Sequence, residues 1–325
     1  MMSDGTLDEL VRGAIAGDRR SLARLLTVVE SGDARFRSVS AAIFAAGRGA
    51  HTVGLTGAPG AGKSSLTDAL VTEIRGRGER VAVVAVDPSS PISGGAILGD
   101  RVRLREAHAM DDDVYMRSLA SRGQLGGLSL AVPPVIRALD AAGWPVVLIE
   151  TVGVGQSEIS IAESADTTVV VVNPGWGDEV QANKAGLLEI ADVLLVNKAD
   201  RPGAAATVRD LERMLHLGAA KDWLPPVLMT VATDGSGLEA LWDAVLRHRH
   251  HLARSGEGAA RRARRRVAET RDRVRHELGL ASTRAERSSR GRDLLLGVER
   301  GLVDPVSAAD DLRRQVAELA VEPPR

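Results

Sequence analysis

Short, continuous apolar runs recur through the middle of the chain. They occupy residues 51–56, 81–86, 146–149, 168–172, 193–196 and 227–229. Unbroken apolar runs are typical of strands that are buried on both faces of a parallel sheet, and segments of helical periodicity separate these runs. The pattern predicts an α/β fold with a doubly wound, mainly parallel sheet.

Helical patterns flank this central region on both sides. The first part of the chain is rich in Ala, Leu and Arg, and the helix indicated by the spacing of Leu22, Leu25, Leu26 and Val29 is expected to be capped by Asp18 or Ser21. Near the other end, a Gly/Ser-rich break precedes an Arg-rich helix over about 259–278, a polar stretch, and a last helix that begins at Asp304-Pro305. We therefore expect three parts: a helical extension (1–50), the α/β domain (51–255) and a helical arm (256–325).

Composition narrows the classes of function. A chain of 325 residues is long enough for about two domains. Its net charge of −1 gives no overall attraction to nucleic acid or to an anionic membrane, so neither is expected as a partner. The absence of cysteine excludes disulfides and thiolate metal sites. No apolar stretch is long enough to span a bilayer, and the acidic N-terminus fits neither a signal nor a transit peptide, so we expect a cytoplasmic protein.

A glycine-rich motif follows the first apolar run and opens a helix. It consists of Gly57, Ala58, Pro59, Gly60, Ala61, Gly62, Lys63 and Ser64, which fit the pattern G-x-x-x-x-G-K-[ST], with Ser65 next in the helix. Its glycines let backbone N–H groups converge on phosphate oxygens at the positive end of the helix dipole. Lys63 would reach the β- and γ-phosphates as a catalytic residue, and Ser64 would bind Mg²⁺. The motif predicts a nucleotide site.

A second motif selects the base. Asn197-Lys198-Ala199-Asp200 follows the run 193–196 and fits the guanine-reading pattern N-K-x-D. Asp200 can accept hydrogen bonds from guanine N1–H and the exocyclic amine, whereas adenine would leave this carboxylate unpaired. Asn197 would hold guanine O6 or brace the phosphate loop, and the stem of Lys198 would cover the base. Val231 and Ala232 follow the last run as a second base-side loop. We therefore expect GTP and GDP as ligands.

Three acidic residues lie at the carboxyl ends of predicted strands or in the loops beyond them, at the sheet edge where α/β proteins bind ligands. Asp87, Asp100 and Glu150 are expected to hold Mg²⁺ together with Ser64, and Asp100 and Glu150 to share in catalysis. A helix cap is the alternative for Asp87. Glu150 also begins an E-x-x-G segment whose Gly153 N–H would sense the γ-phosphate. Because no arginine lies in the phosphate loop and Val154 cannot orient a water molecule, we expect slow intrinsic hydrolysis.

These motifs together resemble the G-protein chaperones associated with methylmalonyl-CoA mutase, some of which once carried the name of arginine/ornithine transport ATPases. The matching runs span most of residues 50–200 and are 57–64, 86–90, 94–100, 122–127, 139–143, 150–158, 177–183 and 197–200. The resemblance implies a P-loop G domain of the signal-recognition and metallochaperone class, with a C-terminal dimerisation arm that makes a homodimer.

The resemblance also implies a function and its partners. It implies GTP hydrolysis that gates the loading of adenosylcobalamin into an acyl-CoA mutase. Methylmalonyl-CoA mutase is the mutase expected first, and a cobalamin adenosyltransferase is a further expected partner. Switch segments would lie at 87–100, 150–158 and 173–184. The residues that it assigns to switches or to the partner surface are Arg122, Gln156, Asp178, Glu179, Gln181 and Lys184.

Two other functions and three local features stay open at the level of sequence. A nickel-insertion GTPase of the same class is one alternative, and a P-loop kinase or transport-coupled ATPase is the other.

His248, His250 and His251 suggest a metal site, but solvated side chains at a helix end fit them better. The arginines of 261–266 are expected on a solvated helix face, since acidic residues follow them. Pro133-Pro134 should start or kink a helix.

Overall fold

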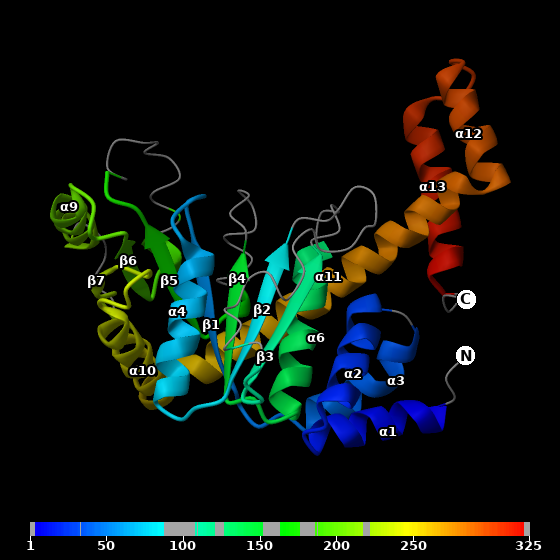
Figure 1. The fold of residues 1–325 in the computed structure, drawn as a ribbon. Helices are drawn as coiled ribbons and strands as arrows, with labels where there is room; N and C mark the ends of the chain where they lie inside the picture. Colours follow the sequence, from blue (N-terminus) through cyan, green and yellow to red (C-terminus); the bar gives the residue numbers. More distant parts are fainter. Residues whose placement is uncertain are drawn as a thin grey trace. The chain divides into compact units, whose positions relative to one another are not determined.

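The fold is built around one parallel sheet (Figure 1). The computed structural model describes residues 4–32, 34–87, 108, 110–120, 127–151, 163–175, 186, 188–216 and 222–321. Within them, seven parallel strands pair in the order β3-β2-β4-β1-β5-β6-β7. The strands are β1 (His51–Gly57), β2 (Val81–Asp87), β3 (Val114–Ala120), β4 (Val146–Thr151), β5 (Thr167–Val172), β6 (Val193–Asn197) and β7 (Val227–Thr230). The predicted doubly wound α/β fold is confirmed.

Each of the six predicted strands exists, and β3 is an addition. This strand lies at one edge of the sheet and pairs only with β2 in the described part of the chain. Its sequence contains Arg117 and Ser118, because an edge strand does not need apolar residues throughout. Arg117 pairs with Glu30 of the N-terminal helices, 2.6 Å away. The polar residues that hide this strand in the sequence therefore attach it to its neighbours.

Helices cover both faces of the sheet (Figure 1). One face packs against α4 (Lys63–Gly76) and α10 (Leu238–Ser255), and Val81 and Val83 point into that core. The opposite face packs against two helices. Helix α6 (Gly127–Ala141) covers one part of it, and α9 (Ala204–His216) packs against β5 and β6. Alternate residues of each strand serve the two cores, as the period of two in a β-strand requires. The phosphate-loop helix α4 is thereby fixed to the sheet along its length.

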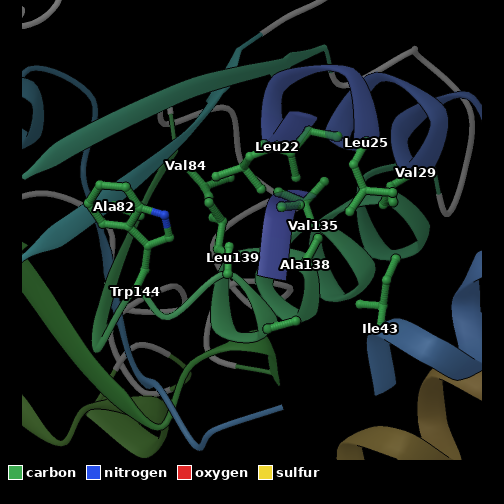
Figure 2. Close-up of a cluster of buried hydrophobic side chains, with 14 of the residues drawn as sticks. Leu22, Leu25, Val29, Ile43, Ala82, Val84, Val135, Ala138, Leu139 and Trp144 are labelled. Atoms are coloured by element: carbon green, nitrogen blue, oxygen red, sulfur yellow. The ribbon is translucent and has the colours of Figure 1, made fainter. Parts of the chain in front are cut away.

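The N-terminal helices share the core of the α/β domain. They are α1 (Asp4–Ile15), α2 (Arg19–Ser31) and α3 (Ala34–Ala45). Figure 2 shows Leu22, Leu25 and Val29 of α2 and Ile43 of α3 against α6, close to β2. Burying each of these side chains contributes about 1.5–3 kcal/mol. Asp18 caps α2 as predicted, since its carboxylate accepts a hydrogen bond of 2.8 Å from Ser21 N–H.

Helix α6 contradicts one of the two expectations for Pro133-Pro134, the helix start, and the kink stays a prediction. It begins at Gly127, so Pro133 and Pro134 lie inside the helix and do not start it. Each proline removes one N–H from the helical hydrogen-bond ladder. The buried residues Val132, Val135 and Leu139 compensate by packing into the core between the sheet and the N-terminal helices.

The C-terminal residues form three helices. These are α11 (Glu257–Arg287), α12 (Ser289–Glu299) and α13 (Pro305–Val321). Helix α11 is longer than predicted, and the stretch expected to be merely polar contains α12. Asp304 caps α13 as predicted, by accepting from Val306 N–H at 3.1 Å and Ser307 N–H at 3.0 Å. The expected boundary between residues 255 and 256 stays a prediction.

The chain divides into two compact units, and the division falls within the sequence of α11, between Arg265 and Arg266. In the second unit, the side chains of Ala281, Ala285, Ala308 and Gln315 are buried. Gly291 lets two helices approach closely, because a Cβ atom there would lie 2.0 Å from the carbonyl oxygen of Ala285. In the described part of the chain, no helix has the length and apolar character that crossing a bilayer requires.

Candidate nucleotide site

The glycine-rich loop leaves β1 at the carboxyl edge of the sheet and enters α4. Gly57, the last residue of β1, has a φ of 131°, and a Cβ atom there would lie 2.0 Å from the carbonyl oxygen of Val171 in β5. Only glycine fits this position. Gly62 precedes α4 in the left-handed conformation, with a φ of 86°. The first N–H groups of α4 therefore point into the loop, where an anion is stabilised by the helix dipole.

Lys63 and Ser64 lie at the start of α4, and their side chains have different partners. The Lys63 ammonium group donates to the carbonyl oxygens of Gly57 at 2.7 Å and Ala58 at 3.0 Å, so it lies across the loop. The Ser64 hydroxyl donates to the carboxylate of Glu150 at the end of β4. Glu150 is only 1% exposed. The Lys63 ammonium group and the Ser64 hydroxyl thus lie on adjacent residues at the helix start, and the Glu150 carboxylate of β4 contacts the hydroxyl.

Asn197 connects the phosphate loop to both base-side loops. Its side-chain amide donates to the carbonyl oxygen of Ala61 at 2.8 Å. Its side-chain oxygen accepts from the hydroxyl of Thr230 at 3.2 Å and from Ala232 N–H at 3.3 Å. Gly62 leaves room for this side chain, because a Cβ atom there would lie 2.6 Å from Asn197 Nδ2. Of the two roles considered for Asn197, the geometry favours the brace.

The neighbouring carbonyl, that of Gly60, is also held from outside the loop. It accepts from the Lys198 ammonium group at 2.6 Å and, at the long distance of 3.5 Å, from the side-chain amide of Asn173. Lys198 has a φ of 58°, the one positive value for a non-glycine residue in the described part of the chain. Such a conformation persists where surrounding contacts impose it.

The hydrogen bonds to the carbonyls of Gly60 and Ala61 orient the N–H groups of the phosphate loop. The C=O and N–H of a trans peptide point in opposite directions. Because the carbonyls of Gly60 and Ala61 are held by outside groups, the N–H groups of Ala61 and Gly62 face the other way. Ala61 N–H donates a hydrogen bond of 3.2 Å to the carbonyl oxygen of Ala58, which closes the turn of the loop. The donors aimed into the concavity are therefore Gly62 N–H and the first N–H groups of α4, which favour an anion there.

The structure describes some of the remaining predicted residues and not others. Asp200 is exposed at the carboxyl edge of the sheet. Val231 pairs with Ser236 in a short bridge beside Ala232. Asp87 ends β2, but its side chain is not described. The residues that lie outside the described part of the chain are Asp100, Arg122, Gly153, Gln156, Asp178, Glu179, Gln181 and Lys184.

A second polar cluster lies at the amino edge of the sheet, and no pattern in the sequence predicted it. Asp166 and Asp192 directly precede β5 and β6 and are almost fully buried. Arg262 contacts Asp166 at 2.7 Å, Arg265 contacts the same carboxylate, and Arg261 contacts Asp192 at 2.9 Å. These arginines were expected on a solvated face. They instead neutralise buried carboxylates, as buried charges require.

Two buried histidines complete this cluster. His51 Nε2 lies 2.9 Å from the Thr167 hydroxyl, and that hydroxyl lies 2.8 Å from Nδ1 of His248. Burial lowers the pKa of His51 to about 4 and that of His248 to about 3. Burial alone would raise the pKa of Asp166, but Arg262 and Arg265 outweigh it and hold that pKa below its usual range. The expectation of a solvated side chain is therefore wrong for His248.

Comparisons with known proteins agree on one family. The family described as methylmalonyl-CoA-mutase-associated GTPase MeaB matches residues 22–287. A Pyrococcus abyssi relative is 44% identical over 95% of this chain and 97% of its own length. GTPase ArgK of Escherichia coli is 37% identical over 79% of this chain and 80% of its own. The mouse protein named methylmalonic aciduria type A homolog, mitochondrial, is 34% identical over 79% of this chain and 66% of its own.

A solved structure extends the similarity to the whole fold. The crystal structure of a protein named LAO/AO transport system kinase matches with a TM-score of 0.72 and 27% sequence identity. The match covers 98% of this chain and 99% of that one, so it includes the helices at both ends of the chain.

Proposed function

The chain belongs to the family of methylmalonyl-CoA-mutase-associated GTPases, and from that premise we propose that its GTPase activity serves as a chaperone switch for a B₁₂-dependent acyl-CoA mutase. In this role GTP hydrolysis gates the loading of adenosylcobalamin and protects the mutase. The observation that carries the proposal is the family match over residues 22–287, and the direct connection from Asn197 of the guanine motif to Ala61 of the phosphate loop supports the nucleotide site that the switch needs. Through this connection, occupancy of the base site acts on the peptide groups that hold the phosphates.

The nucleotide would occupy the carboxyl edge of the sheet. Its phosphates would lie on the residues 57–65, with Lys63 leaving the Gly57 and Ala58 carbonyls to pair with the β- and γ-phosphates. Asp200 would read guanine N1–H and the exocyclic amine, beside Val231 and Ala232. Lys198 would cover the base with its stem while its ammonium group stays on Gly60. Gly153 would sense the γ-phosphate.

A magnesium ion fits the oxygen donors present. Mg²⁺ prefers oxygen ligands and binds through one or two protein oxygens together with phosphate and water. The Ser64 hydroxyl and the Glu150 carboxylate already contact each other at the end of the loop. Asp87 and Asp100 are proposed as further carboxylates near this site. When bound, the ion would neutralise phosphate charge, and Glu150 would keep Ser64 oriented toward it.

The partner proposal is tested by hydrolysis with and without a mutase. Lys184 follows the glycine-rich run 174–178, which ends at Asp178, and Glu179 and Gln181 lie between that run and Lys184. We expect the cognate mutase to raise the GTPase rate, and Lys184→Ala to abolish that increase while leaving the intrinsic rate within about threefold. Lys221→Ala, a change to a lysine outside this segment, is the matched control. A Lys184→Ala protein that responds like the wild type contradicts the proposal, and so does rapid turnover without the mutase.

The second unit supports the proposed homodimer. The part of α11 that belongs to this unit exposes an apolar stripe at Val267, Val274 and Leu278, which are 50%, 53% and 47% exposed. These residues recur at helical spacing on the face that, further along, buries Ala281 and Ala285. We expect Leu278→Glu to convert a dimer into a monomer in light scattering, while Thr283→Glu, on the opposite face of the helix, leaves the dimer intact. A monomeric wild type, or a dimeric Leu278→Glu protein, contradicts the arm as the interface.

A further inference from the structure

Thr207 of α9 joins two loops that leave neighbouring strands. The turn Asn173–Gly175 follows β5, and the loop Lys198–Gly203 follows β6. The Thr207 hydroxyl accepts a hydrogen bond from Gly175 N–H at 3.1 Å and donates to the carbonyl of Gly203 at 3.2 Å. Thr207 is 4% exposed, so water does not compete freely for these contacts. One side chain therefore holds both loops.

The helix alone explains only half of this arrangement. A threonine in the first turn commonly donates its hydroxyl back to a carbonyl four residues earlier, which accounts for Gly203. The contact with Gly175 N–H crosses to another element and contributes nothing to α9. The two loops approach closely there, because a Cβ atom on Gly203 would lie 3.8 Å from Gly175 N.

Both loops that Thr207 joins act on the same peptide of the phosphate loop. Asn173, at the start of the turn, and Lys198, at the start of the other loop, each donate to the carbonyl of Gly60. Asp200 lies between Lys198 and Gly203 in the second loop. A shift of either loop would therefore move a donor away from Gly60 and, in the second loop, move the carboxylate proposed to read guanine.

We propose that Thr207 is a positioning residue for the guanine nucleotide. It keeps the turn 173–175 and the loop 198–203 together, so that Gly60 stays oriented and Asp200 meets the base edge. Thr207 itself does not contact the nucleotide. The assignment rests on the proposed role of Asp200 and adds a residue that determines base specificity from behind the binding loop.

The test is nucleotide affinity in Thr207→Val and Thr207→Ser proteins, measured by calorimetry with GDP and with IDP. IDP lacks the exocyclic amine, so the ratio of the two affinities reports how well Asp200 is placed. Valine keeps the shape of the side chain and leaves Gly175 N–H unpaired, so we expect about tenfold weaker GDP binding. We also expect the preference for GDP over IDP to fall by about threefold or more. Serine keeps the hydroxyl and should restore both values to within about twofold.

The preference between GDP and IDP separates positioning from stability, because loss of stability alone weakens both nucleotides equally. Thr207→Ala provides a second variant without a branched side chain, and its expected result is that of valine. Equal losses for GDP and IDP, or a Thr207→Val protein that binds as the wild type does, overturn the assignment. A wild type with no preference for GDP over IDP contradicts the proposed role of Asp200 and overturns this assignment with it.

Discussion

The side-chain amide of Asn197 lies 2.8 Å from the carbonyl oxygen of Ala61, although 136 residues separate the two in the sequence. This hydrogen bond joins the end of β6 to the loop after β1 across the intervening strand β5. The base motif and the phosphate loop are therefore parts of one hydrogen-bonded structure. Changes in one of them should be measurable as changes in the other.

Removing the Asn197 side chain should weaken nucleotide binding strongly. Asn197→Ala leaves the Ala61 carbonyl, the Thr230 hydroxyl and Ala232 N–H without this partner. Each unpaired buried group costs about 1–3 kcal/mol, so we expect at least a tenfold loss of GDP affinity in calorimetry. Thr230→Val removes only one of the three hydrogen bonds and should have a smaller effect. Equal losses in the two variants would mean that the contact with Ala61 contributes nothing.

Neutralising Glu150 should change the response to magnesium. Glu150→Gln keeps an oxygen that can accept from Ser64 but removes the negative charge. We expect the Mg²⁺ concentration for half-maximal GTP hydrolysis to rise about tenfold or more, and GDP affinity without Mg²⁺ to change less than about threefold. An unchanged magnesium titration curve in the variant would remove Glu150 from the metal site.

Stability should fall as the pH is lowered through the range in which free histidine titrates. His51 and His248 stay neutral in the folded protein, with pKa values lowered to about 4 and about 3. Unfolded histidine has a pKa of about 6.5, so between that pH and about 4 the unfolded chain binds protons that the folded protein does not. The free energy of unfolding should therefore drop by about 1 kcal/mol per histidine between pH 7 and about pH 5.5.

Urea unfolding at these two pH values measures this drop. His51→Gln should lose about half of it, because one buried histidine remains. His250→Gln, a change at an exposed histidine of α10, should behave as the wild type. A His51→Gln protein with the full drop would show that His51 is not responsible for this pH dependence.

The features that were predictable from the sequence are those whose signal lies within a few residues. The apolar run 193–196 followed by Asn197-Lys198-Ala199-Asp200 indicates both a strand and its ligand edge, and β6 ends at Asn197 as that pattern requires. The caps at Asp18 and Asp304 are equally local. The partner atoms of both caps lie within three residues, so spacing alone predicts those contacts.

The features that the sequence did not reveal depend on partners far along the chain. Arg262 looks like a solvated residue until Asp166 is placed beside it, 96 residues away. Strand β3 is inconspicuous because Arg117 pairs with Glu30 of the N-terminal helices. Thr207 is an ordinary helical threonine in the sequence, since its contact with Gly175 arises only when two loops meet. Local patterns contain no signal for any of these pairs.

Exchanging the base of the nucleotide decides whether the connected loops bind guanine nucleotides through Asp200. Calorimetry with GDP, ADP and XDP would be performed on the wild type and on Asp200→Asn. We expect the wild type to bind GDP and to prefer it over ADP by at least about a hundredfold. We also expect Asp200→Asn to lose most GDP affinity and to gain XDP, because an amide can donate to the O2 of xanthine where the carboxylate only accepts. A wild type that binds ADP as tightly as GDP, or an Asp200→Asn protein that keeps its GDP affinity, would contradict guanine recognition by Asp200.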